Sequence, residues 1–146
     1  MERKARMAGI EGNGIQEQDM QATPSRTVDR FADLLGVEHL SASFEQAACR
    51  LRLGAEHHNA LGGVHGGLIF SLADIAFAAA CNAGQALYIG LQAEVRYMAR
   101  ARGDELTATA TWMGGGRNIA HYQVLVTDNL GNRIALFSAS AYRLGQ

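Results

Sequence analysis

The residues best suited to catalysis lie near the middle of the chain. His65-Gly66-Gly67 opens a long apolar run in which Asp74 is the one charged residue. The first amides of a helix lack internal acceptors, and together with the helix dipole they can bind an oxyanion. A carboxylate in an apolar run is costly unless it is partnered, and working sites often bear that cost. The alternative interpretation is that Asp74 only bonds a nearby backbone group or Ser71.

The spacing of these groups limits how they can cooperate. Gly66 and Asp74 are eight residues apart, which is about 12 Å along a helix at 1.5 Å per residue. One reacting carbonyl cannot touch both groups of the same helix. If both act on one substrate, they come from two antiparallel copies that face each other across a dimer, and the enzyme is an obligate oligomer.

The run that carries the acid is predicted to be a helix. Residues 68–81 contain neither Gly nor Pro, and Leu and Ala dominate, so helix is favoured. Apolar residues occur all round it, which is typical of a helix buried in a core. It is shorter than the roughly 20 residues that a membrane span requires. We therefore expect Asp74 to be buried inside a soluble domain.

The rest of the chain is dominated by alternating apolar and polar residues, the pattern of strands with one buried face. In the strand expected at 87–98, Leu87, Ile89 and Leu91 belong to the apolar set, and Trp112 belongs to that of 105–113. These alternations predict an α+β arrangement, a mostly antiparallel sheet of five to six strands with one central helix. The strands are expected at 37–43, 45–53, 87–98, 105–113, 117–127 and 133–142, with turns at 114–116 and 128–132.

The N-terminal part is expected to contribute little chemistry. Residues 1–22 mix charges, Gly and Gln without an apolar period, which predicts a flexible lead. Thr23-Pro24-Ser25 is typical of a helix start and Gly36 of a helix end. This short helix, with Val28 and Phe31 on its apolar face, is expected to cover one end of the core.

Composition excludes several classes of function. A net charge of −1 gives no electrostatic case for nucleic acid or an anionic membrane. Cys49 and Cys81 fall in apolar patterns and are expected to be buried thiols rather than a disulfide or a nucleophile. His57 and His58 lack a third ligand at a recognisable spacing, so we expect solvated loop histidines and no metal. Gly114-Gly115-Gly116 joins two strands, which favours a hairpin turn over a phosphate loop. No signal peptide is evident, so the cytoplasm is the default location.

The motifs together resemble the hotdog-fold acyl-CoA thioesterases, and within them the branch associated with phenylacetate degradation. The likeness covers roughly residues 35–146. It implies a single hotdog domain at 23–146, in which the antiparallel sheet wraps around the central helix. The matching segments are Asn59, His65-Gly66-Gly67, Phe70-Ser71-Leu72-Ala73-Asp74, Ala76-Phe77-Ala78, Cys81-Asn82, Gly103-Asp104-Glu105-Leu106-Thr107-Ala108-Thr109-Ala110 and Ile134-Ala135-Leu136-Phe137.

The resemblance implies a role for each matched residue. Asp74 would be the general base that activates water, or the nucleophile itself. The Gly66 amide would polarise the thioester carbonyl, and His65 and Asn59 would orient the carbonyl or the water. The site would lie between two subunits of a homo-oligomer, a dimer at least and a tetramer by expectation, with no metal or organic cofactor. Further substrate contacts are expected from Gly67, Phe70, Phe77, Gln92 and Arg100.

Two segments depart from the family pattern. Relatives often supply a Ser or Thr hydroxyl from the strand after the helix, and here Gln92 or Tyr88 would have to substitute. Relatives also commonly read Phe-Leu-Arg-Pro where this chain reads Tyr97-Met98-Ala99-Arg100. The entrance for the CoA nucleotide is therefore expected to differ. Arg100 could meet its phosphates or simply be solvated.

The function that these residues favour is hydrolysis of an acyl-CoA thioester, with an aryl-acetyl or a medium-chain acyl group. Two alternatives stay open: a hotdog hydratase or dehydratase, and a non-catalytic acyl-CoA-binding module. A Ser–His–Asp hydrolase built from Ser71, His65 and Asp74 is a poorer hypothesis, because no strand-turn-helix nucleophile motif is present.

Overall fold

The structure, a computed structural model, describes residues 28–145. The flexible lead predicted for residues 1–22 and the helix start predicted at Thr23-Pro24-Ser25 lie outside them. The elements in chain order are α1 Arg30–Leu35, β1 Val37–Ala42, β2 Gln46–Arg52, the 3-10 helix η1 Ala55–His57, α2 Gly66–Cys81, β3 Tyr88–Tyr97, β4 Glu105–Gly115, β5 Ile119–Asp128 and β6 Arg133–Arg143.

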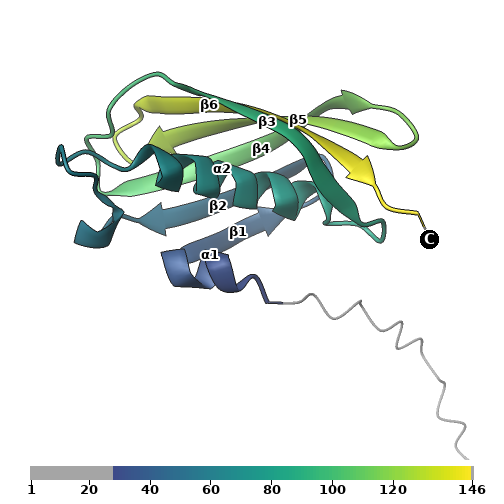
Figure 1. The fold of residues 1–146 in the computed structure, drawn as a ribbon, viewed down its shortest axis with the longest axis horizontal. Coiled ribbons are helices and arrows are strands. Elements are labelled where there is room, and N and C mark those ends of the chain that lie inside the picture. Colours follow the sequence, from purple (N-terminus) through teal and green to yellow (C-terminus); the bar gives the residue numbers. More distant parts are fainter. Residues whose placement is uncertain (1–27, 146) are drawn as a thin grey trace, which may run out of the picture.

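All six strands form one antiparallel sheet, in the order β1-β2-β4-β5-β6-β3. The long helix α2 lies across one face of this sheet, and the short α1 lies beside β1 (Figure 1). The prediction of an α+β fold with one central helix is confirmed. The edges of the sheet are β1 and β3, each of which has a single neighbour.

Alternation along the strands builds the core. The inward side chains of the central strands are almost completely buried against α2, and each large one contributes roughly 1.5–3 kcal/mol by leaving water. The buried side of α2 carries small residues such as Ala73, Ala76 and Ala80, and these let the helix approach the sheet closely. The largest fully buried side chains on the strands are Leu51, Leu106, Tyr122, Val124, Val126, Ile134 and Phe137.

The prediction that α2 is buried on all sides is wrong. Gly67, Asp74 and Ala78 are exposed and Ser71 is half-buried. These four residues are spaced by three or four positions, so they form one stripe along the helix. We call this stripe the open face of α2. Asp74 is therefore not enclosed within a single chain.

The edge strand β3 also departs from the expected pattern. The apolar residues Leu87, Ile89 and Leu91 are 54%, 48% and 56% exposed. The pairing of β3 with β6 shifts between Gly90 and Gln92, which places Leu91 at a bulge. An apolar strand with an unpaired side is thus left open to solvent.

Two other predicted details differ at the far end of the sheet. Trp112 is 41% exposed rather than buried with Ala108 and Ala110. The glycine run 114–116 is not all turn: β4 extends to Gly115, and Gly114 has φ 139° beside a register shift in the β4–β5 pairing. The glycine therefore forms a bulge near the hairpin.

The first helix is shorter than predicted. Asp29 caps it by accepting hydrogen bonds from the amides of Phe31 and Ala32 at 3.1 and 2.9 Å, and Gly36 ends it with φ 77°. Val28 precedes the cap, so it is outside the helix. Val28 and Phe31 are exposed, and the core contacts are made by Ala32 and Leu35.

A carboxylate closes the loops at one end of the sheet. Asp128, only 5% exposed, accepts hydrogen bonds from the amides of Arg102, Gly103, Leu130 and Asn132 and from the Asn132 side chain. Burial opposes its charge, but these donors outweigh burial and hold the pKa of Asp128 well below its usual range. This cluster, the Asp128 clasp, ties the segment between β3 and β4 to the β5–β6 turn.

Candidate active site

The amides in the first turn of α2 are almost all occupied. The Gly67 amide donates to His65 Nδ1 at 2.9 Å. The amides of Leu68 and Ile69 both donate to the His65 carbonyl, at 3.0 and 3.3 Å. Within the described residues the Gly66 amide has no acceptor. The helix therefore presents one unpaired N–H at its positive end.

His65 is the N-cap of the helix, and this role sets its tautomer. Its Nδ1 accepts the Gly67 amide proton, so in the neutral ring Nε2 carries the hydrogen. The side chain is exposed. His65 thus combines a structural role at Nδ1 with a donor at Nε2.

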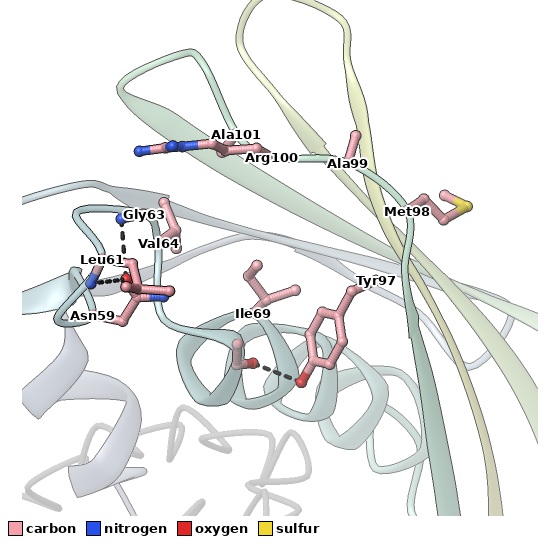
Figure 2. A pocket seen from close by; sticks show the side chains of 11 residues that line it. Asn59, Leu61, Gly63, Val64, Ile69, Tyr97, Met98, Ala99, Arg100 and Ala101 are labelled. Carbon is pink, nitrogen blue, oxygen red and sulfur yellow. Dashed lines mark hydrogen bonds between the residues drawn. The ribbon is translucent and has the colours of Figure 1, made fainter.

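A cavity of about 440 Å³ opens beside the helix start, and we call it the helix-start cavity. Asn59 shapes its loop wall, because Asn59 Oδ1 accepts the amides of Leu61 and Gly63 at 2.9 and 3.1 Å (Figure 2). Arg100 donates from Nη2 to the Gly62 carbonyl at 2.9 Å, which places a guanidinium at this wall. The full lining is Asn59, Leu61, Gly63, Val64, Gly66, Ile69, Tyr97, Met98, Ala99, Arg100 and Ala101.

Asp74 projects from the open face of α2. Its carboxyl makes no hydrogen bond or ion pair with any described residue. The predicted alternative of a bond to Ser71 is wrong, since Ser71 Oγ donates to the Gly67 carbonyl at 2.7 Å. Although the carboxylate reaches the surface of the single chain, desolvation by its surroundings and then the nearby Asp29 carboxylate raise the pKa of Asp74. An unpaired carboxyl with a raised pKa is suited to proton transfer.

A second cavity, of about 390 Å³, adjoins Asp74, and we call it the acid cavity. Aromatic rings support it: Phe77 packs against Tyr122 with centroids 5.6 Å apart, and Tyr88 packs against Phe44 at 5.7 Å. Its lining is Asp74, Phe77, Ala78, Cys81, Asn82, Tyr88, Gly90, Leu91, Gln92 and Ala93.

Asn82 fixes the wall that β3 gives to this cavity. Its side chain accepts the Tyr88 amide at 2.8 Å and donates to the carbonyls of Tyr88 and Ala78, both at 3.2 Å. The amide group thus joins the end of α2 to the start of β3.

The predicted site residues divide between the two cavities. Gly66, Asn59 and Arg100 line the helix-start cavity, whereas Asp74, Phe77 and Gln92 line the acid cavity. The remaining three predicted residues line neither: His65 and Gly67 form the helix cap, and Phe70 is half-buried with its ring 5.2 Å from that of Phe137.

Sequence reasoning missed Tyr97 and Asn82 as parts of the site. Asn82 is separated from Asp74 by eight residues, which is two helical turns and a cap, so helical spacing could have placed it near the same end. The sequence placed Tyr97 near the end of a predicted strand. That position alone does not show which other segment the end of the strand contacts.

Several other side chains take structural roles. Cys49 and Cys81 are free buried thiols, as predicted. Burial, then the Asp29 carboxylate, raises the pKa of Cys49 to about 11, and burial raises that of Cys81 to about 12. His57 is only 7% exposed and accepts the Gly54 amide at 2.9 Å, so the prediction that it is solvated is wrong.

Residues 28–145 contain neither a cluster of metal-ligating side chains nor a helix suited to a membrane. No three His, Cys, Asp or Glu side chains within residues 28–145 gather as a metal site. No helix in that range has the length and apolar character to cross a membrane.

Comparison with known proteins gives a consistent set of matches. The family model described as Thioesterase superfamily matches residues 61–135. The acyl-coenzyme A thioesterase PaaI of Escherichia coli is 30% identical over 118 residues, which cover 80% of this chain and 84% of PaaI. Acyl-coenzyme A thioesterase 13 of Homo sapiens is 27% identical over 119 residues, which cover 79% and 85% of the two chains.

Solved structures agree with these sequence matches. The Escherichia coli PaaI protein, from the phenylacetic acid degradation operon, superposes with a TM-score of 0.76 at 30% identity and covers 81% of this chain and 86% of its own. The TT0310 protein of Thermus thermophilus superposes with a TM-score of 0.74 at 31% identity and covers 80% and 98%.

Proposed function

The chain belongs to the Thioesterase superfamily, and from this premise we propose that it hydrolyses acyl-CoA thioesters to the free acid and CoA. One observation carries the proposal. The only first-turn amide of α2 without an acceptor in the described residues belongs to Gly66, and the unpaired carboxyl of Asp74 projects from the same helix. Thioester hydrolysis requires a hydrogen-bond donor that stabilises the oxyanion and a group that accepts a proton from the attacking water.

The proposed reaction assigns one role to each group. The Gly66 amide, with the positive end of α2 behind it, stabilises the oxyanion that forms on the carbonyl oxygen. Asp74 takes a proton from a water as the water oxygen bonds to the carbonyl carbon. The carbon–sulfur bond then breaks, and the proton passes to the CoA thiolate. In the alternative, the Asp74 carboxylate attacks the carbonyl carbon, the carbon–sulfur bond breaks and CoA leaves as the thiolate. Water then hydrolyses the mixed anhydride to the free acid, which regenerates Asp74 and supplies the proton that the thiolate takes up.

The supporting residues supply donors and a binding surface. His65 Nε2–H and the Asn59 side-chain amide would orient the substrate carbonyl or the water. The Arg100 guanidinium, at the wall of the helix-start cavity, would meet the CoA phosphates. The reaction uses only protein groups and water, so we propose no metal or organic cofactor.

We propose that each site combines two chains. Gly66 and Asp74 line different cavities of one chain, and eight helical residues separate them by about 12 Å. The exposed apolar edge strand β3 supports pairing with a second copy, because an unpaired strand edge readily accepts another strand. In such a dimer the open face of α2 would meet the helix start of its partner.

The acid cavity indicates the acyl group. Its wall carries the rings of Phe77 and Tyr88 together with Leu91, and this apolar aromatic lining favours an aryl-acetyl group over a medium-chain one. The phenylacetate connection of the PaaI relatives agrees with this choice.

The first experiment measures CoA release from a panel of aryl-acetyl and medium-chain acyl-CoAs with a thiol reagent. Asp74→Asn should lower kcat by about 10²–10⁴-fold, the range for a lost general base. Asp33→Asn, an exposed α1 acid outside both cavities, is the matched control and should keep wild-type kinetics. A near wild-type rate in Asp74→Asn would remove Asp74 as base or nucleophile.

The second experiment isolates the Gly66 amide. Proline is well tolerated at the first position of a helix, and the extended backbone of His65, φ −64° and ψ 130°, suits a residue before proline. Gly66→Pro removes the N–H, whereas Gly66→Ala adds a Cβ and keeps it. Gly66→Pro should have a kcat about 10²–10³-fold below that of Gly66→Ala, and equal rates would refute the oxyanion role.

The same panel separates the other reaction classes. Conversion of an enoyl-CoA to a hydroxyacyl-CoA without thiol release would indicate a hydratase. Tight acyl-CoA binding without any product would indicate a binding module.

A further inference from the structure

The last residue of β3 reaches the first turn of α2. The Tyr97 hydroxyl donates a hydrogen bond to the Gly66 carbonyl at 2.9 Å, and Figure 2 shows the ring directed at the helix start from the opposite wall of the cavity. The two residues are 31 positions apart in the chain. Tyr97 is therefore a long-range contact to the residue whose amide we assign to the oxyanion.

This contact completes the restraint of one peptide unit. The Gly66 carbonyl and the Gly67 amide belong to the same planar group. Tyr97 binds its oxygen, and His65 Nδ1 binds its N–H at 2.9 Å. Because glycine has the greatest backbone freedom of any residue, these two side-chain contacts add to the helical hydrogen bonds in fixing a pair of glycines at the helix end.

The ring also explains why residue 66 is glycine. Gly66 is not among the glycines with positive φ, so its backbone does not demand glycine. A Cβ placed on it would instead lie 3.2 Å from the Tyr97 Cζ and hydroxyl oxygen, closer than ordinary van der Waals contact. An alanine at residue 66 would therefore require the Tyr97 ring to move by a few tenths of an ångström.

We propose that Tyr97 is a positioning residue for the reaction, because it fixes the Gly66–Gly67 peptide and thereby aims the preceding Gly66 amide at the substrate oxygen. The inference rests on the proposed thioesterase function. Tyr97 acts through Gly66 and need not touch the acyl group, so its loss should change turnover rather than binding.

Tyr97→Phe tests this by removing one oxygen atom. We expect kcat to fall by about threefold to tenfold, the equivalent of one net hydrogen bond, while KM stays within about twofold of wild type. Tyr142→Phe is the matched control, since Tyr142 is an exposed β6 tyrosine outside both cavities. A rise in KM at constant kcat would show direct substrate contact, and unchanged constants would show no role. Either result overturns the proposal.

A second readout does not depend on catalysis. Water-exchange NMR should show the Gly67 amide exchanging about threefold to tenfold faster in Tyr97→Phe than in wild type. Unchanged exchange would overturn the proposed restraint even if no acyl-CoA is hydrolysed. An inactive wild type with faster exchange in the variant would refute the thioesterase function and leave the restraint standing.

A double substitution tests the packing argument. Gly66→Ala should lower the melting temperature in the Tyr97 background and have a smaller effect in the Tyr97→Ala background, where the added Cβ meets no ring. Equal losses in the two backgrounds would show that the ring does not explain the glycine.

Discussion

The two-chain site makes a quantitative prediction about mixed dimers. A carbonyl bound at about 3 Å by an amide and attacked from about 3–3.5 Å holds the amide and the attacking atom within roughly 7–8 Å of each other. Where that atom is a water, its hydrogen bond to Asp74 extends the distance between the two protein groups to roughly 10 Å. Gly66 and Asp74 of one helix are about 12 Å apart. The proposed reaction therefore requires Gly66 from one chain and Asp74 from the other.

The perturbation is to divide two inactivating substitutions between the chains. Gly66→Pro and Asp74→Asn subunits, with different affinity tags, are co-expressed, and the heterodimer is purified through both tags. One of its two sites receives both substitutions, and the other is intact. The heterodimer should have about half of the wild-type kcat per dimer, because a two-fold dimer contains two equivalent sites.

The parent homodimers provide the baseline for the thiol-release assay, since both should be nearly inactive. If Gly66 and Asp74 act within one chain, every site of the heterodimer carries one defect, and no activity should reappear. A heterodimer no more active than its parents would refute the two-chain site, even if each single substitution behaves as expected.

Three further predictions follow from individual side chains. Because the pKa of Asp74 is raised and a base must be deprotonated, kcat/KM should fall on the acid side with a midpoint above the ordinary Asp value of about 3.9; a midpoint at or below that value would contradict the role of Asp74. Arg100→Ala should raise KM for acyl-CoA but not for an acyl-pantetheine that lacks the nucleotide phosphates, with Arg117→Ala as control; equal effects on both substrates would remove the phosphate contact. Asp128→Ala should lower the free energy of unfolding in urea by about 2–3 kcal/mol near neutral pH, because it orphans buried donors. The depressed folded-state pKa of Asp128 stabilises the fold above its unfolded value of about 3.9, so the loss should shrink as pH falls below it, and a pH-independent loss would contradict this linkage.

The sequence predicted the elements well where local chemistry decides them. The absence of Gly and Pro from 68 to 81 correctly indicated α2, alternation along 105–110 correctly gave the inward face of β4, and the strand expected at 117–127 corresponds to β5. These patterns reflect burial of side chains within the same chain. They can be recognised in the sequence without knowing which distant segments contact each other.

The sequence could not assign faces that lie outside the single-chain core. An apolar count around α2 did not separate the buried Ala73 and Ala76 from the exposed Asp74 and Ala78. The alternation of β3 likewise predicted a buried row, because Leu91 has the same composition whether it meets a core or solvent. Asp74 was thus placed correctly on the helix, but the prediction that its own chain buries it was wrong.

Tyr97 was missed for a topological reason. Its contact with Gly66 exists because the outer strand β3 returns past the start of α2, and no local pattern encodes that return. His57 was misjudged in a similar way, since a one-turn helix turns its ring inward to meet the Gly54 amide. Both errors concern side chains whose partners are set by loop or strand geometry.

The open side of β3 has a consequence for the newly made chain. Its ten residues from Tyr88 to Tyr97 offer an uncapped ladder of backbone donors and acceptors, and Leu91 adds an apolar bulge beside it. A monomer with this edge uncovered is therefore prone to pair with other chains and to aggregate. If the proposed dimer covers this edge, a charged residue introduced at Leu91 should prevent the pairing, and light scattering should detect monomers without large aggregates.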